Sequence, residues 1–292
     1  MNRLLIIFFT ATVTLTVALV GCAAEPEDIP DPEPIQFAPN DWPWWRGPHR
    51  NGVAAANQDL PLHWSATENV VWSTPVPGRG HGAVTVMGDQ LFLATADKAL
   101  QIQSVICYDR DSGEQQWQTT IHEGGFVEGQ NQKASYASSS VACDGRQLFI
   151  SFLHDGRLLT TALDRSGNLV WQTQISDYVM HQGYGASPAP YGSLVIVAAD
   201  NKGGGAIAGL HRATGQIVWT HTRPKTPNYS SPIILNAAGR DQLSLELQTN
   251  LVDHQQVRWS HRGLVPSGAD AVKDQGGLGF GRHDHGALAH RL

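Results

Sequence analysis

This sequence contains few cysteines and little clustered positive charge. Its 292 residues include three cysteines, and only 16% of the residues are charged, with a formal net charge of −6. Binding along a nucleic-acid backbone needs clustered Lys and Arg, and no basic cluster occurs in the part of the sequence that is expected to fold. The composition therefore argues against nucleic acid as a partner.

Several catalytic signatures are also missing from the sequence. It contains no Cys-x-x-Cys pair, no Cys-x-x-Cys-His site for haem and no Gly-x-Ser-x-Gly elbow. The hydroxyl-rich Ser135–Ser140 is interpreted as a strand edge, and the glycines of Asn201–Gly205 as a hairpin loop rather than a phosphate cradle. The carboxylates at strand ends and turns are expected to cap those turns; they are Asp97, Asp144, Asp164 and Asp200. These patterns predict no catalytic residue and no metal site.

Residues 1–22 are typical of a lipoprotein export signal. Arg3 precedes an apolar stretch from Leu4 to Val20, and the signal ends in Leu-Val-Gly-Cys at Cys22. This ending resembles a bacterial lipobox, which implies cleavage before Cys22 and attachment of lipid to that residue. An uncleaved membrane helix is the alternative, although the apolar run falls short of the ~20 residues of a span. Ala23 in the next position weakly favours the outer membrane.

The rest of the chain divides by composition into three parts. Residues 23–40 alternate acids with prolines, which favours an extended tether. Residues 41–243 are expected to fold. Residues 244–292 show neither strand nor helix periodicity and are expected to form a degenerate or disordered tail. No scaffold would fix the tail's histidines, so they predict no physiological metal site; they include His283, His285 and His290.

Three segments of the middle region align on a tryptophan. They are YDRDSGEQQW (Tyr108–Trp117), LDRSGNLVW (Leu163–Trp171) and LHRATGQIVW (Leu210–Trp219). Each contains Ser/Thr-Gly-x-x-x-Trp and follows an apolar strand, which predicts a β-hairpin. A second strand pair lies upstream in each unit, so each repeat is expected to hold four strands. With Trp72 marking a partial first unit, the tryptophans lie 45, 54 and 48 residues apart, a spacing typical of propeller blades.

The repeat predicts an all-β fold, a β-propeller of four-stranded blades. A blade cannot bury both of its faces alone, so neighbouring sheets pack face to face and one large side chain per blade can cover the interface. We therefore predict structural, blade-docking roles for Trp117, Trp171 and Trp219.

The tryptophan hairpins resemble the repeat of the pyrroloquinoline-quinone-like (PQQ-like, or quinoprotein-type) β-propeller superfamily. The resemblance covers roughly residues 42–243, and the opening WPWWRGPHRNGVA resembles the first blade of an exported lipoprotein group of planctomycete-type bacteria. Propellers of this superfamily close with seven or eight blades, whereas this chain holds about four to five. The resemblance therefore implies a propeller that is incomplete at the C-terminus, and the tail from Ser244 is interpreted as a degenerate or frameshifted remnant.

Two groups of residues are candidates for ligand contact. Trp42, Trp44 and Trp45 are interpreted as packing residues that seal the first blade or the base of the propeller, and a carbohydrate-stacking platform is the alternative. A second group lies near the start of blades, where innermost strands line a propeller's channel. It consists of His81, Tyr136, Gln182 and Tyr184. These four either face a ligand or form hydrogen-bonded channel packing, and the sequence favours the packing.

The resemblance also supplies expectations about function. Quinoprotein dehydrogenases of the superfamily hold PQQ with calcium beside a catalytic aspartate, commonly over a disulfide of adjacent cysteines. Cys107 and Cys143 are not adjacent, and we expect buried free thiols, with a disulfide as the alternative. PQQ and calcium are thus implied by resemblance alone.

The favoured function is a membrane-anchored binding or scaffold module at the cell envelope, without a catalytic site. Its layout of lipobox, tether and propeller resembles the propeller lipoproteins of the outer-membrane barrel-assembly machinery, which hold partner proteins. An envelope protein is therefore the expected partner. The alternatives are a PQQ-dependent alcohol or sugar dehydrogenase and a carbohydrate-binding envelope protein.

Overall fold

The regular structure of the described residues consists of β-strands. The computed structural model describes residues 31–56, 58, 60–237 and 239–246, and the backbone of three short strands at 258–260, 263–265 and 287–291. Within these residues, no helix is long and apolar enough to span a membrane. The export signal with Cys22, most of the tail, and the side chains of its histidines lie outside the described residues.

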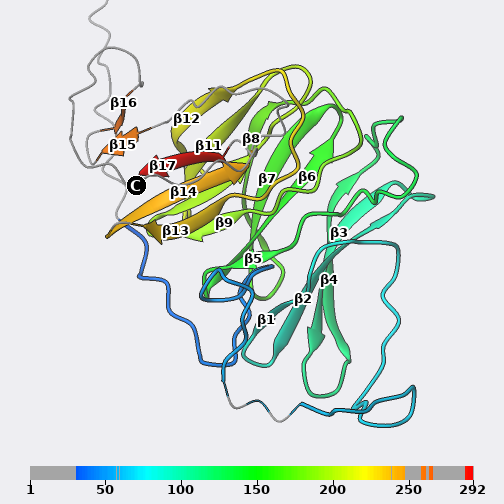
Figure 1. Ribbon diagram of the computed structural model, residues 1–292. Helices are drawn as coiled ribbons and strands as arrows, with labels where there is room; N and C mark the ends of the chain where they lie inside the picture. Colours follow the sequence, from blue (N-terminus) through cyan, green and yellow to red (C-terminus); the bar gives the residue numbers. More distant parts are fainter. Residues whose placement is uncertain are drawn as a thin grey trace, which may run out of the picture. The chain divides into compact units, whose positions relative to one another are not determined.

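Three four-stranded antiparallel sheets follow one another along the chain (Figure 1). The first contains β1 (Thr85–Met87), β2 (Gln90–Asp97), β3 (Ile102–Asp109) and β4 (Gln115–Glu123). The second contains β5 (Ala142–Cys143), β6 (Gln147–His154), β7 (Arg157–Asp164) and β8 (Leu169–Asp177). The third contains β9 (Ala189–Tyr191), β10 (Leu194–Ala198), β11 (Gly205–His211) and β12 (Ile217–Arg223). Each sheet keeps its strands in chain order, which confirms the all-β fold of four-stranded blades.

A fourth sheet continues the series and takes strands from the expected tail. It contains β13 (Ile233–Ala237), β14 (Arg240–Glu246), β15 (Arg258–Ser260), β16 (Gly263–Val265) and β17 (Ala287–Arg291). Its strand order is β13-β14-β17-β15-β16, and β15 pairs with β17 in parallel. The boundary expected after residue 243 therefore falls inside β14.

The inner and outer strands of each sheet differ in burial, as sheets stacked face to face require. All five residues of β10 are buried, and β6 is buried along its middle six residues. The fourth strand β8 instead alternates buried and exposed residues at several positions. Continuous burial shows that both faces of an inner strand are covered, whereas alternation is typical of a strand with one face toward solvent.

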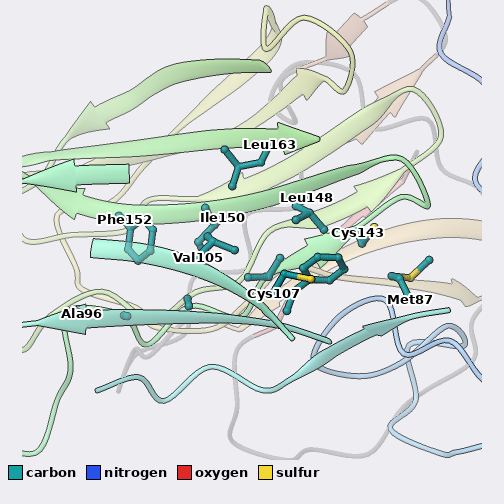
Figure 2. Packing of buried hydrophobic residues seen from close by; sticks show 13 residues of the cluster. Met87, Ala96, Val105, Cys107, Cys143, Leu148, Ile150, Phe152 and Leu163 are labelled. Carbon is teal, nitrogen blue, oxygen red and sulfur yellow. The ribbon is translucent and has the colours of Figure 1, made fainter. Parts of the chain in front are cut away.

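An apolar cluster joins the first sheet to the second. Figure 2 shows Val105 and Cys107 of β3 beside Leu148 and Ile150 of β6, all of them almost fully buried. A corresponding cluster joins the second sheet to the third. Burial of side chains of this size stabilises the fold by about 1.5–3 kcal/mol each, so these clusters hold neighbouring sheets together.

The tryptophans near the start of β4 and β8 each contact the β-turn of the following sheet. The indole nitrogen of Trp117 donates to the carbonyl of Arg165 at 3.1 Å, and the Thr119 hydroxyl donates to the carbonyl of Gly167 at 2.7 Å. These contacts span the interface between the first and second sheets. The predicted docking role of Trp117 therefore has a specific geometry.

The same two contacts recur at the next interface and before the first sheet. Trp171 and Thr173 of β8 donate to the carbonyls of Arg212 and Gly215 at 2.8 and 2.7 Å. Upstream, Trp72 donates to the carbonyl of Arg110 at 2.9 Å, and Thr74 to that of Gly113 at 2.8 Å. The repeat extends to Trp72 as the tryptophan spacing predicts.

The turn glycines are required both for backbone conformation and for space. Gly167 has φ +87° and Gly215 has φ +74°, a region that L-residues other than glycine rarely adopt. A Cβ atom at Gly167 would lie 2.8 Å from the ring of Trp117, and one at Gly215 would lie 2.6 Å from the ring of Trp171. The glycine of the Ser/Thr-Gly-x-x-x-Trp motif thus leaves room for the preceding sheet's indole.

The aspartates expected to cap turns do so in three cases. Oδ1 of Asp97 accepts from two backbone N–H groups, at Ala99 and Leu100, and Asp144 and Asp164 cap their turns in the same way.

Asp200 differs from the expected cap, because its carboxylate forms a buried ion pair with Arg223 at 2.7 Å and accepts from Asn228. Asp144 also pairs with Arg212, which lies on the third sheet and is equally buried. In each pair, a buried guanidinium compensates the charge of a buried carboxylate.

A buried histidine is held in its neutral form beside the first interface. Nε2 of Gln103 donates to two carbonyls, so its Oε1 accepts from Nδ1–H of His122 at 2.8 Å. The opposite nitrogen of His122 then accepts from Gln172, and its ring stacks on that of His154 at 4.3 Å. Burial, followed by the charges of His154 and Arg157, lowers the pKa of His122 to about 4.

The turn glycine can be tested by substitution. Gly215→Ala should destabilise the fold by about 3 kcal/mol, because it adds a clash with Trp171 to the strain of a positive φ. Gly156→Ala is the matched control, since Gly156 has φ +70° but open space around its Cβ position, and it should cost about 1 kcal/mol. Urea unfolding followed by circular dichroism measures both. Equal losses would show that the indole contact adds nothing to the glycine requirement.

The buried histidine predicts a loss of stability in acid. A folded pKa of about 4, below the ordinary 6.5, means that the neutral form stabilises the fold above pH 6.5 and that this contribution is lost as the pH falls from 6.5 toward 4. His122→Gln keeps hydrogen-bonding groups but cannot titrate. Between pH 7 and pH 4.5, the free energy of unfolding of this variant should therefore fall by on the order of 1–2 kcal/mol less than that of the wild-type protein. Identical pH profiles of the melting temperature would contradict this assignment.

Candidate functional site

A cleft of about 400 Å³ lies where the connection between β4 and β5 meets the end of β2. We call it the Tyr136 cleft. One wall comes from Arg79, Ala96 and Lys98, and the other from residues 128–136 of the connection. The backbones of Arg79 and Ala96 exchange two hydrogen bonds, of 2.8 and 3.1 Å, which fix the entry to the first sheet beside the end of β2.

The connection that forms the second wall is tied down at several points. Its Asn131 N–H donates to the carbonyl of Gln182 at 3.0 Å, and its Tyr136 carbonyl accepts from Gln103 at 2.8 Å. Arg79 donates to the carbonyl of Lys133 across the cleft at 3.1 Å. A wall that is ordered in advance loses less conformational entropy when a ligand binds.

Tyr136 supplies the aromatic surface of the cleft. Its half-buried ring stacks on Phe126 with centroids 4.0 Å apart. Burial, and then the charge of Glu128, raises the pKa of the Tyr136 hydroxyl, which therefore remains protonated at neutral pH. The cleft thus combines a neutral aromatic side chain with polar groups.

Tyr184 lies on the far side of Tyr136 and has a different environment. Both rings line a separate cavity of about 10 Å³, close to the volume that one water molecule needs. The Tyr184 hydroxyl donates to the carbonyl of Ala198 at 3.0 Å, and its ring packs edge-on against Tyr178. Burial raises the pKa of the Tyr184 hydroxyl. Its hydrogen bond to a main-chain carbonyl is the kind expected of a residue that packs inside the protein.

His81 and Gln182 line neither of these two cavities. Both side chains are exposed, and each residue contacts the connection between β4 and β5 through its main chain instead. The N–H of His81 donates to the carbonyl of Ala137, while the carbonyl of Gln182 holds Asn131. That these residues, with Tyr136 and Tyr184, face a ligand in a central channel stays a prediction.

Sequence reasoning missed the polar residues that form most of the Tyr136 cleft. They include Arg79, Lys98, Glu128, Gln130 and Gln132. One signal was present, because the interval between the tryptophans of the first and second sheets is 54 residues, longer than its neighbours of 45 and 48. The additional length lies largely in the connection that forms the cleft's second wall.

The tryptophans of the opening segment serve packing more than binding. Trp44 is 4% exposed and belongs to the apolar cluster between the third and fourth sheets, which confirms the packing interpretation for this residue. The main chain of Trp42 pairs with Val86 of β1, and Gly47 turns back with its N–H donating to Trp44. Trp45 is only partly buried and lies under the guanidinium of Arg46. The three rings do not form one exposed platform.

A second exposed feature is the stretch of residues 60–76, which we call the entry segment. It carries large apolar side chains that face solvent, with Leu62 89% and Val71 90% exposed. Trp72 and Thr74 fix this segment to the turn of the first sheet. Several large apolar side chains exposed within one segment are typical of sites of protein contact.

The described residues do not fit a site for calcium and a quinone. No group of three or more His, Cys, Asp and Glu side chains in the described ranges is placed to hold a metal ion. Asp144 and Asp200 are already paired with buried arginines. Cys107 and Cys143 are buried free thiols, as expected, and burial raises the pKa of each to about 12, so neither supplies a reactive thiolate.

Curated relatives of known activity match most of this chain but only part of their own length. The polyvinylalcohol dehydrogenase of Sphingopyxis sp. (strain 113P3) is 26% identical over 227 residues, which are 72% of this chain and 32% of the relative. The polyvinylalcohol dehydrogenase of a Pseudomonas sp. is 26% identical over 226 residues, 71% of this chain and 33% of the relative. The chain spans about a third of the length of these enzymes.

Solved structures show a partial likeness. A europium-containing methanol dehydrogenase aligns with a TM-score of 0.45 at 18% identity, covering 63% of this chain and 32% of the enzyme. BamB from Moraxella catarrhalis aligns with a TM-score of 0.41 at 16% identity, covering 61% of this chain and 51% of BamB.

A family model gives the firmest assignment. The model described as outer membrane protein assembly factor BamB matches residues 51–177 and 101–273. These residues make up more than half of the chain and include the tryptophan hairpins from Trp72 to Trp219. The chain therefore belongs to this family of PQQ-like propeller repeat proteins.

Proposed function

We propose that this protein is a binding module of the cell envelope, anchored by lipid on Cys22, that holds a partner protein against its entry segment. The description of its family as an assembly factor supports a scaffolding role. The observation that carries the proposal is the exposed apolar entry segment, which is fixed to the first sheet yet covered by nothing in the described part of the chain.

The repeat shows what kind of partner surface fits the entry segment. Trp117 and Trp171 lie on fourth strands, each of which is the edge strand of a sheet with three further strands. Trp72 makes the same pair of contacts, but residues 60–76 contain no strand. The entry segment thus occupies the place of a fourth strand that lacks its sheet.

The partner is accordingly a protein with a free β-sheet edge. Main-chain hydrogen bonds of an added strand would supply affinity, and Val71 would pack against the partner's sheet. Main-chain groups that belong to no sheet are a template for such pairing, and residues 60–76 belong to none among the described residues. The packed sheets of the remaining scaffold would hold that edge in a fixed position.

A quinone-dependent dehydrogenase activity is less well supported. The matched relatives are dehydrogenases, but this chain covers only about a third of each. Two of the described carboxylates at strand ends, Asp144 and Asp200, are engaged in buried ion pairs. We derive no redox step for this protein.

Partner binding can be tested by photo-crosslinking in the producing cells. A photoreactive amino acid placed at Val71 should give a covalent adduct with one envelope protein, and the linked peptide should come from an edge strand of that protein. The same amino acid at the exposed Glu114 is the control and should give no such adduct. An adduct only with a second copy of this chain, or no adduct at Val71, would contradict the proposal.

Lipid anchoring is tested separately. Cys22→Ser should move the protein from the membrane fraction to the soluble periplasmic fraction, and it should abolish incorporation of labelled palmitate. If the wild-type protein is lipidated as proposed, it should fractionate with the outer membrane on a density gradient. A Cys22→Ser variant that stays in the membrane would favour an uncleaved N-terminal helix.

A further inference from the structure

We propose that the Tyr136 cleft binds a short oligosaccharide that carries carboxylate groups, an oligouronate. This inference concerns a different surface from the entry segment and does not depend on partner binding.

The cleft presents side-chain carboxamides that are free to bind a ligand. Gln130 and Gln132 line it, and neither side chain makes a hydrogen bond within the described ranges. Asn131 uses its Oδ1 to accept from the N–H of Lys133, which leaves its NH₂ group for a ligand. Each carboxamide both donates and accepts, so a row of them matches the neighbouring hydroxyl groups of a sugar ring.

The aromatic ring of the cleft is rigidly placed for a sugar. Tyr136 is held by Phe126 on one side and through its backbone by Gln103. Ligand sites typically combine such aromatic side chains with a few placed polar groups. The apolar C–H face of a sugar ring would pack on the part of Tyr136 that lines the cleft, while its hydroxyls meet the carboxamides.

The charges of the cleft favour an acidic sugar over a neutral one. Arg79 and Lys98 both line it from the side of the first sheet, and neither belongs to an ion pair among the described residues. Ala96 is the bridge partner of Arg79 and lies two residues before Lys98, which brings the two cations to the same wall. Glu128 is the one acidic residue of the lining. Two cations against one acidic residue suit the carboxylates of a short oligouronate, whereas densely sulfated or phosphorylated chains would meet stronger repulsion from Glu128.

The cleft is of suitable size but offers little to a peptide. Its volume of about 400 Å³ lies within the range of small-molecule sites, ≈ 300–1,000 Å³. Apart from Tyr136, its apolar lining consists of Ala96 and Ala134. An acidic peptide would therefore find no pocket for an apolar side chain, and a hydroxyl-rich ligand fits the lining better.

Calorimetric titration of the purified full-length protein in mild detergent tests the inference. A trimer of galacturonic acid should bind saturably, and the neutral trimer maltotriose should bind at least about tenfold more weakly. Lys98→Ala should weaken binding of the galacturonate trimer by about tenfold, and Gln132→Ala by about fivefold. Lys225→Ala removes an exposed lysine that does not line the cleft, and its affinity should be unchanged.

Several results would overturn the inference. These are no heat from a protein whose circular dichroism shows β-sheet, equal binding by the Lys98→Ala and Lys225→Ala variants, and equal affinity for maltotriose. Tighter binding of a sulfated trisaccharide or a tetraglutamate peptide would also overturn it, because either would assign the cleft to another ligand class. Crosslinking at Val71 is unaffected by any of these outcomes, so the two proposals fail separately.

Discussion

An indole ring lying on a glycine turn is the contact on which the rest of this structure depends. Each four-stranded sheet has two faces to bury, and the described residues contain no helix to cover them, so its neighbours must do so. The indole of one sheet donates to the turn of the next, and a threonine two residues later repeats the contact. The turn glycine tolerates this approach because it has no Cβ. Neighbouring sheets are thereby fixed in one register.

The docking turns and the candidate site lie at opposite ends of the strands. The tryptophans contact the turns between the third and fourth strands, such as the one that follows Asp109. The Tyr136 cleft instead lies at the other end, where β2 and β4 finish. The docking contacts therefore place little constraint on the part of the connection from β4 to β5 that lines the cleft, which carries mostly polar residues. This separation is typical of folds that support binding with loops on a rigid scaffold.

The sequence allowed the repeated parts to be predicted, because they rest on short-range patterns. Strand number, the Trp117 hairpin and the caps at Asp97 and Asp164 each follow from a few consecutive residues. The ion pair between Asp200 and Arg223 and the walls of the cleft could not be predicted, since they join residues that only the fold brings together. The entry segment reads like a strand, but its expected sheet is absent from the described residues.

A double-mutant cycle at the first interface tests the central contact most directly. Trp117→Phe and Gly167→Ala are made singly and together, and the free energy of unfolding is measured for all four proteins. If the glycine makes room for the indole, the smaller ring should relieve part of the alanine clash, and the two changes should couple by about 1 kcal/mol. Strictly additive changes would show that the indole and the glycine act independently, which would contradict this account of how the sheets are held together.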